Sequence, residues 1–298
     1  MAVPTLSSSR QRPLPEASLT LAVRIKRFWS NHQIASYIIL SLLGAGTVLP
    51  LLWMFSTAFK QTSAFYVYPP NFIPEHPTLS NFSDVFKLGL GRALGNSIIV
   101  AAAMTVIVVV TSTMAGYALA KIPFRGRSVV FAALLSGLMI PWEITIVPLY
   151  IFIVKLGWVN TYHGVVLPMC ATPLGIFIMR QFLQSIPDEL IDAARLDGAS
   201  EFAIFRQIIV PLCRPATAAL ATIIFLSAWG AFLWPLIASS QNDMQTLPVA
   251  IALLQQQYTS SYGLMMAGAT VAFIPALATF LAFQRYFVQG ITMSGFKG

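Results

Sequence analysis

Charged residues are scarce in this chain. Only 9% of its 298 residues are charged and 57% are hydrophobic, whereas about 25% of the residues in a soluble domain are charged. This composition excludes an ordinary soluble domain and indicates an integral membrane protein. The net charge of +8 does not point to nucleic acid as a partner, because the basic residues form no stripe that could follow a phosphate backbone.

Cysteine and histidine are also rare. The two cysteines, Cys170 and Cys213, have neither metal-binding nor redox spacing, and we interpret both as small hydrophobic residues. The three histidines are scattered along the chain and predict no metal site. No lysine is followed by Ser or Thr, so a phosphate-binding loop of the form G-x-x-x-x-G-K-[ST] is missing. We therefore expect that this chain is not an enzyme and binds no cofactor itself.

Long apolar segments, in contrast, are abundant. A helix rises about 1.5 Å per residue, so about 20 residues cross a hydrocarbon core of about 30 Å. Six runs without Lys or Arg reach that length: Ile34–Phe59, Asn96–Ala120, Ser128–Val154, Leu156–Met179, Pro215–Ala238 and Tyr262–Gln284. We therefore expect an all-α polytopic membrane protein with six transmembrane helices. The fourth run is the least regular, because Pro168, Pro173 and Gly175 interrupt it.

Basic residues are divided unequally among the segments that join these runs. Of the 18 Lys and Arg residues, 14 lie in the segments 1–33, 121–127, 180–214 and 285–298. The opposite loops contain Lys60, Lys87, Arg92 and Lys155. Because cytoplasmic loops carry the excess of Lys and Arg, we expect the first group of segments in the cytoplasm. Both termini would then be cytoplasmic, and the loops 60–95 and 239–261 external.

Few side chains inside the apolar runs suggest a substrate pathway. Glu143 is the only acidic residue in them, and intramembrane acids mark functional sites by default. A structural carboxylate bonded near a proline of its own span is an equal alternative. Asn96, Trp229 and Trp234 carry amide and indole groups that suit a sugar, but tryptophan also packs in cores and anchors helices at the interface. We favour packing for these three and keep all four as candidate pathway residues.

One charged segment, residues 184–214, separates the fourth and fifth runs. Acidic residues at its start suit a helix N-terminus, and Ser185 is the expected cap. Gly198 is expected to end this first short helix in a left-handed conformation, and Ser200 to cap a second short helix. A rigid block of this kind on the cytoplasmic side suits docking into the groove of a partner.

The block carries a family resemblance. Its sequence DAARLDGASEFAIFRQIIVPL, at 192–212, resembles the EAA loop of the permease subunits of bacterial ABC importers, with Asp192 where the family usually has Glu. The residues that match that loop are Ala193, Ala194, Asp197, Gly198 and Pro211. Further segments look familiar in the same order: NSIIVA (96–101), AGYALAKIPFRGR (115–127), MIPWEITIVPLY (139–150), LGWVNTYHGVVLP (156–168) and QRYFVQGITMSGFKG (284–298). The set is similar to carbohydrate-uptake permeases of the maltose type, specifically the six-span partner of the pair.

The resemblance implies a division of labour among several chains. This subunit would form half of a translocation pathway in the bacterial inner membrane, and a second permease subunit the other half. Two ATP-binding subunits would carry ATP and Mg, and an external solute-binding protein would deliver a sugar or polyol to the 239–261 loop. The residues implied to contact the ATPase lie in the 184–214 block: Asp192, Ala193, Ala194, Asp197, Gly198, Ala199 and Pro211.

The expected organisation is therefore a cytoplasmic tail (1–33), a six-span permease domain (34–290) and a second cytoplasmic tail (291–298), whose end the resemblance places toward the ATPase. Three alternatives remain. An ion-coupled secondary transporter usually shows midplane ionisable residues and internal repeats, and this chain has one off-centre acid and no repeat. A membrane scaffold without transport would not need the charged block. An ABC importer for glycerol phosphate or a glycerophosphodiester is the third.

Overall fold

The computed structural model describes residues 31–61, 71–258 and 261–295. All regular elements within these ranges are helical, as expected for an all-α protein. The chain divides into two compact units, Met1–Trp53 and Met54–Gly298. The expected N-terminal tail lies outside the described residues except for its last three positions, where the first helix begins.

The helices of the first half are α2 (Asn31–Ala58), α3 (Ser80–Lys87), α4 (Leu90–Lys121), α5 (Arg127–Ser136), η3 (Gly137–Met139), α6 (Trp142–Lys155), α7 (Tyr162–Val166) and η4 (Leu167–Cys170). Those of the second half are α8 (Pro173–Gln184), α9 (Asp188–Leu196), α10 (Glu201–Ile204), η5 (Phe205–Ile209), α11 (Val210–Leu212), α12 (Arg214–Trp229), α13 (Leu233–Ala238), α14 (Leu247–Gln257) and α15 (Tyr262–Gly295). The last helix continues past residue 290, where the sequence placed the end of the membrane domain.

The first unit holds α2 as far as Trp53, and the residues at positions 35–50 of this apolar helix are all exposed. Tyr37, Leu42 and Leu43 have 65%, 68% and 63% of their surface accessible. A helix that is hydrophobic all round is stable only in lipid or inside a larger assembly. This part of the chain is therefore suited to a membrane rather than to water.

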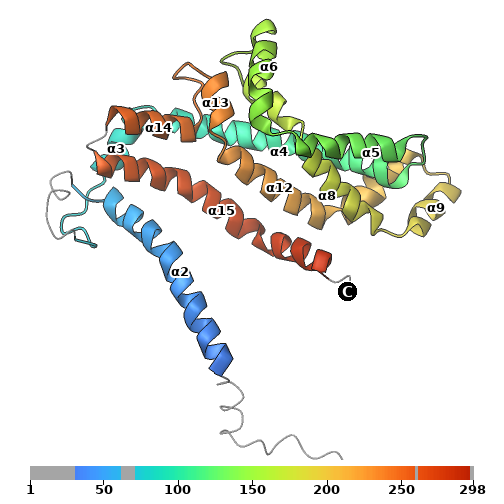
Figure 1. Ribbon diagram of the computed structural model, residues 1–298, viewed down its shortest axis with the longest axis horizontal. Coiled ribbons are helices and arrows are strands. Elements are labelled where there is room, and N and C mark those ends of the chain that lie inside the picture. Colours follow the sequence, from blue (N-terminus) through green and yellow to red (C-terminus); the bar gives the residue numbers. More distant parts are fainter. Residues whose placement is uncertain (1–30, 62–70, 259–260, 296–298) are drawn as a thin grey trace, which may run out of the picture. The chain divides into compact units, whose positions relative to one another are not determined.

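The second unit is organised around α4. This helix packs along α8 and α12, and Figure 1 shows it running from the end that holds α3 and α14 toward the end that holds α9. Small residues allow the closest approach: a Cβ at Gly116 would lie 2.8 Å from the Cβ of Met179, and one at Gly175 would lie 2.4 Å from the Oγ of Ser112. Such positions let helix backbones approach within the membrane, where packing drives helix association.

Membrane-length helices are fewer than the six apolar runs. In the described part of the chain, three helices are long and apolar enough to cross a membrane: Ile34–Ala58, Leu90–Lys121 and Tyr262–Gln284. Three further candidates are bent pairs: Arg127–Met139 with Trp142–Lys155 at 99°, Tyr162–Cys170 with Pro173–Gln184 at 47°, and Glu201–Leu212 with Arg214–Trp229 at 75°. The count reaches six only if each bent pair is one span, so the expected number is not confirmed.

Proline accounts for two of these breaks. Ile140 and Thr172, which directly precede Pro141 and Pro173, both have extended backbone conformations. A proline ring clashes with a helical residue before it and lacks the N–H group that a continuing helix would use. The third and fourth runs are therefore each broken at a proline and helical on either side of the break.

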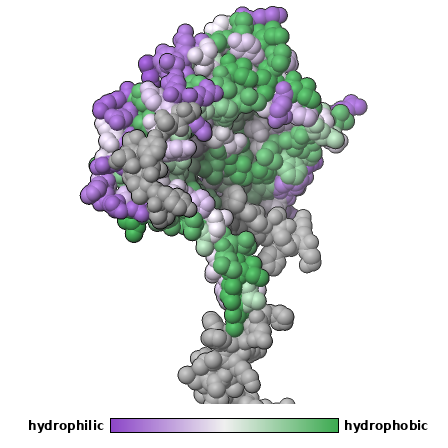
Figure 2. All heavy atoms as spheres, turned by 60° about the vertical axis from the view of Figure 1, so that its left-hand side comes forward, coloured by the Kyte–Doolittle hydropathy of each residue, from purple (hydrophilic) through white to green (hydrophobic). Residues whose placement is uncertain are grey.

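Much of the exposed surface is hydrophobic. Figure 2 shows broad hydrophobic areas on one face of the molecule, and exposed apolar side chains on α5 and α6 include Val129, Ile144 and Val147. Exposed apolar area of this extent marks a surface that lipid or another chain covers. Apolar side chains on the outer surface agree with an integral membrane protein.

Candidate functional site

The charged block at 184–214 begins with α9. Its N-terminal cap position is Pro187, and the first turn contains Asp188 and Glu189, where negative charge is stabilised by the helix dipole. Ser185 is not the cap, contrary to the expectation from the sequence: it ends α8, and its Oγ donates to the carbonyl of Phe182 at 2.7 Å. Pro187 separates the two helices because it cannot continue the hydrogen-bond pattern of α8.

The turn after α9 depends on Gly198. Its φ of +83° lies in the left-handed region, which glycine enters without the steric cost that a Cβ imposes. The amide of Gly198 donates to the carbonyl of Arg195 at 3.0 Å, and the amide of Ala199 donates to that of Ala194 at 3.0 Å. These bonds satisfy the last carbonyls of α9, and the predicted left-handed end of this helix is confirmed.

A second short helix follows at once. The Oγ of Ser200 accepts the amide of Ala203 at 3.3 Å and caps α10, as predicted. The chain then passes through the π-helical turn η5 and α11 to Cys213, where it bends by 75° into α12. Pro211 lies exposed two residues before this bend. The π-helical turn was not anticipated, because the apolar pattern of residues 204–209 is also compatible with an ordinary α-helix.

The block has a buried and an exposed face. Ile191, Ala194 and Ile204 are buried in the core of the second unit. On the outside, Leu196 is 89% exposed and Phe202 is 70% exposed. Two large apolar side chains held outward on a rigid turn are typical of a surface that another protein covers.

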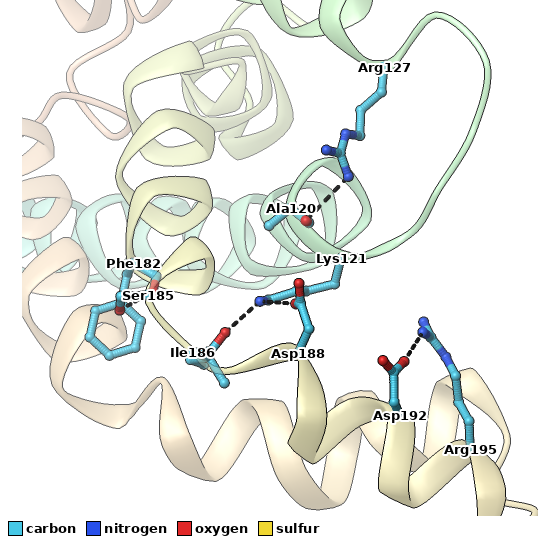
Figure 3. A network of polar contacts seen from close by, with 9 residues as sticks. All are labelled: Ala120, Lys121, Arg127, Phe182, Ser185, Ile186, Asp188, Asp192 and Arg195. Atoms are coloured by element: carbon cyan, nitrogen blue, oxygen red, sulfur yellow. Dashed lines mark hydrogen bonds and ion pairs between the residues drawn. The ribbon is translucent and has the colours of Figure 1, made fainter.

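The first polar tie of the block is made by Lys121, at the end of α4 (Figure 3). Its Nζ donates to the carbonyl of Ile186 at 2.6 Å and pairs with the carboxylate of Asp188. The Lys121 side chain is only 4% exposed, while that of Asp188 is 76% exposed. The hydrogen bond from Lys121 holds the pKa of Asp188 below its ordinary value.

The second polar tie starts from Tyr117, one turn earlier on α4. Its hydroxyl donates to Oε2 of Glu201 at 2.7 Å. Arg195 donates from Nε to the other oxygen of Glu201 at 2.8 Å and from Nη1 to Asp192 at 3.0 Å, and the bond to Glu201 raises the pKa of Arg195. The chain of contacts therefore joins α4, α10 and α9.

The residues that resemblance assigned to coupling lie together in this block. Asp192, Ala193 and Asp197 are exposed, Ala194 is buried beneath them, and Ala199 is half-buried. Tyr117, Lys121 and Glu201 were not anticipated. Tyr117 and Lys121 are four residues apart and share a helix face, but nothing in the sequence indicates partners more than 60 residues away.

Three of the candidate pathway residues are bonded within the chain. Asn96 donates from Nδ2 to the carbonyls of Asp243 and Gln245, at 2.9 and 3.0 Å, and its Oδ1 accepts the hydroxyl of Tyr162 at 2.7 Å. The indole of Trp229 donates to the carbonyl of Ala272 at 3.0 Å. Trp234 donates to the carbonyls of Gly164 and Val165 at 3.1 and 3.2 Å. All three side chains are buried, which agrees with the packing roles that we favoured.

Glu143 stands apart from these three. It lies exposed in the first turn of α6, directly after the break at Pro141. The first turn of a helix is a common position for an acidic residue. The adjacent Trp142 contacts Trp234 edge-on, with ring centroids 6.0 Å apart, so the start of α6 lies beside α13.

A family model described as "Binding-protein-dependent transport system inner membrane component" matches residues 112–293. The chain belongs to this family. The match contains the whole charged block together with Tyr117 and Lys121 on α4, so the block lies in the part of the permease that defines the family. The membership predicted from the EAA-like sequence is confirmed, and the ion-coupled alternative is not favoured.

Individual relatives agree with the family match. The permease is 40% identical over 255 residues to the arabinooligosaccharides transport system permease protein AraQ of Halalkalibacterium halodurans, covering 84% of this chain and 91% of the relative. It is 34% identical over 257 residues to the trehalose/maltose transport system permease protein MalG of Thermococcus litoralis, covering 84% of this chain and 92% of the relative. The crystal structure of a bacterial ABC transporter involved in the import of the acidic polysaccharide alginate matches with a TM-score of 0.77 at 19% identity, over 93% of this chain and 100% of that chain. This last likeness shows that the fold is shared.

Proposed function

We propose that this permease is the transmembrane subunit of an ATP-driven, binding-protein-dependent importer of a sugar, an oligosaccharide or a related polyol. The observation that carries the proposal is the family match over residues 112–293. Relatives named for arabinooligosaccharide and for trehalose or maltose transport support a carbohydrate substrate. Glycerol phosphate uptake is the competing substrate class.

The proposed function requires partner proteins, because this chain alone would not bind ATP, complete the pathway or deliver the substrate. A phosphate-binding loop is missing from the sequence, so two separate subunits would bind ATP and Mg and drive transport. A second permease subunit would complete the pathway and cover part of the apolar surface. A solute-binding protein on the outer side would deliver the substrate to the region of residues 239–261.

The 184–214 block would dock onto the ATPase. The outward apolar pair Leu196 and Phe202 supplies the kind of anchor that dominates protein interfaces. Asp192 lies one helical turn before Leu196 on α9, with 65% of its side chain exposed, although it pairs with Arg195. An exposed carboxylate next to apolar anchors would select a basic partner surface.

Charge reversal at Asp192 tests this docking. Asp192→Lys would place a cation next to Arg195 and face the partner with the wrong sign, so we expect capture of the ATPase subunit to fall about 10-fold or more. Asp192→Glu keeps the charge and restores the usual residue of the EAA loop, so capture should remain close to that of the wild type. Equal capture of the ATPase subunit by both variants would show that Asp192 does not contribute to the interface.

Substrate and energy source are tested together in liposomes that contain the purified complete transporter with its binding protein. Uptake of labelled arabino-oligosaccharide, maltose and glycerol 3-phosphate should each be measured with ATP and with ionophores that collapse proton and sodium gradients. We expect ATP-dependent uptake of a carbohydrate that ionophores leave unchanged. Uptake that needed a gradient, or that was restricted to glycerol 3-phosphate, would contradict the proposal.

A further inference from the structure

One face of α4 holds α9 and α10, the two short helices of the 184–214 block, which is the proposed coupling block. Tyr117 and Lys121 are four residues apart, which places them one above the other on a helix. Tyr117 bonds Glu201 at the start of α10, and Lys121 bonds Asp188 at the start of α9 and the Ile186 carbonyl before it. Neither short helix can therefore shift relative to α4 without breaking a hydrogen bond.

The opposite end of α4 holds the segment before α14 in a similar way. Asn96 binds the carbonyls of Asp243 and Gln245, and the Oγ of the adjacent Ser97 accepts the amide of Leu247 at 2.7 Å. Asn96 and Ser97 are both buried. Buried hydrogen bonds are directional and strengthened by the low dielectric around them, so they fix position better than apolar contacts, which can slide.

The two sets of bonds are separated by about the thickness of a membrane. Asn96 and Tyr117 are 21 positions apart, and a helix rises about 1.5 Å per residue, which gives about 31 Å. The hydrocarbon core is about 30 Å thick. Of the three uninterrupted membrane-length helices in the described residues, α4 is the one without an internal proline, since α2 contains Pro50 and α15 contains Pro275.

We propose that α4 transmits movement between the coupling block and the 243–247 segment, and that Tyr117, Lys121, Asn96 and Ser97 are the positioning residues that fasten it at either end. The inference rests on the proposed function, in which the block contacts the ATPase and the 239–261 region faces the solute-binding protein. An unbroken helix bonded at both ends moves as one body. Docking of the binding protein on the outer side would then bias the position of the block on the inner side.

The test uses the complete transporter in liposomes and compares its ATP hydrolysis with and without the substrate-loaded binding protein. Tyr117→Phe and Ser97→Ala each remove one hydroxyl while keeping most of the side-chain volume. We expect each variant to lower the ratio of stimulated to unstimulated hydrolysis by about fivefold or more, the lower end of typical allosteric coupling. A change confined to local packing would lower the amount of assembled complex instead of this ratio.

Thr111→Val is the matched control on the same helix. Thr111 is exposed, and its Oγ1 donates to the carbonyls of Ile107 and Val108 in the preceding turn, at 2.8 and 3.3 Å. Loss of that hydroxyl leaves both ends of α4 fastened. The stimulation ratio of Thr111→Val should therefore equal that of the wild type, and an equal fall in the control would overturn the inference.

The double variant Ser97→Ala/Tyr117→Phe decides whether the two ends act through one element. If α4 carries the coupling, the double variant should lose no more stimulation than the worse single variant. Loss of the hydrogen bond at one end would already uncouple the two ends, so losing the bond at the other end would have no further effect. Independent local effects would multiply. Multiplicative losses, or an unchanged ratio in complexes that assemble normally, would refute the role of α4. Failure of the wild-type chain to capture any ATPase subunit would instead refute the proposed function.

Discussion

Gly198 has a backbone conformation that constrains the turn between α9 and α10 in the 184–214 block. Apart from Gly198 itself and its two chain neighbours, no heavy atom lies within 4 Å of the place where its Cβ would stand, so no other part of the chain crowds a Cβ there. The constraint comes from φ alone, at +83°. Asparagine tolerates this region far better than a β-branched residue, which makes the position testable by two substitutions of comparable size.

We expect Gly198→Val to abolish uptake and to weaken capture of the ATPase subunit, while membrane abundance stays near normal. Backbone strain of this kind costs on the order of 1–3 kcal/mol, which displaces α9 without affecting insertion of the apolar helices. Gly198→Asn should retain most of the uptake. The measurement is labelled-sugar uptake normalised to the amount of permease in the membrane; if valine and asparagine behaved alike, φ would not be the constraint.

Asp188 gives the block a pH dependence. Its pKa is lowered by the hydrogen bond from Lys121, so the stability that this pair contributes is present above the ordinary carboxyl pKa and is lost as pH falls through the lowered value. Because the carboxylate is largely exposed, the effect is small. As the pH falls below about 4, the unfolding midpoint of the wild type in detergent should fall slightly further than that of Asp188→Asn. Parallel pH profiles would show that the pair contributes nothing.

At the scale of elements, the close contact between α4 and α8 makes a strong demand on side-chain size. A Cβ at Gly116 would lie 2.8 Å from the Cβ of Met179 and 3.0 Å from the amide nitrogen of Arg180. Neither neighbour is the free end of a flexible side chain, so the helices would have to separate. The crossing is therefore intolerant of even one methyl group.

Gly116→Ala should destabilise the permease by about 1–3 kcal/mol, as overpacked cores do. Gly95→Ala on the same helix is the matched control, because no heavy atom outside its own stretch of helix lies within 4 Å of its Cβ position and alanine favours a helix over glycine. The unfolding midpoint in detergent should fall for the first variant and stay level or rise for the second. The opposite order would mean that α4 and α8 are not in close contact.

Elements differ in how well the sequence predicts them. The positions of the helices were predicted from the long runs without charged residues. A long apolar segment is most stable in the membrane, and there it forms a helix. Pro141 and Pro173 were visible in the sequence, yet proline is tolerated inside membrane helices when neighbouring groups satisfy the freed carbonyls, so composition alone did not reveal bends of 99° and 47°. The role of Tyr117 could not be predicted for a different reason. Its partner Glu201 is 84 positions away in the sequence and comes close only because the block folds back onto α4.

At the scale of the whole molecule, orientation in the membrane is the main prediction. The uneven distribution of Lys and Arg predicts that the 121–127 loop lies inside and the 60–95 loop outside. In a variant without Cys170 and Cys213, an impermeant thiol reagent should modify a cysteine that replaces exposed His76 in intact cells and spare one that replaces exposed Arg125. After the cells are opened, both should react. Labelling of position 125 alone in intact cells would invert the topology.

The π-helical turn at Phe205–Ile209 joins α10 to α11 and sets the rotation of α10 about the helix axis relative to α11. A π-helical turn holds one residue more than an α-helical turn, and each residue of a helix corresponds to a rotation of about 100°. Deleting one residue there would allow α10 and α11 to join in a regular α-helix, apart from the one hydrogen bond that Pro211 cannot donate. The block would then be rotated by about a quarter-turn or more, and Leu196 and Phe202 would point in a new direction. The number of residues in this turn thus determines the direction in which Leu196 and Phe202 face.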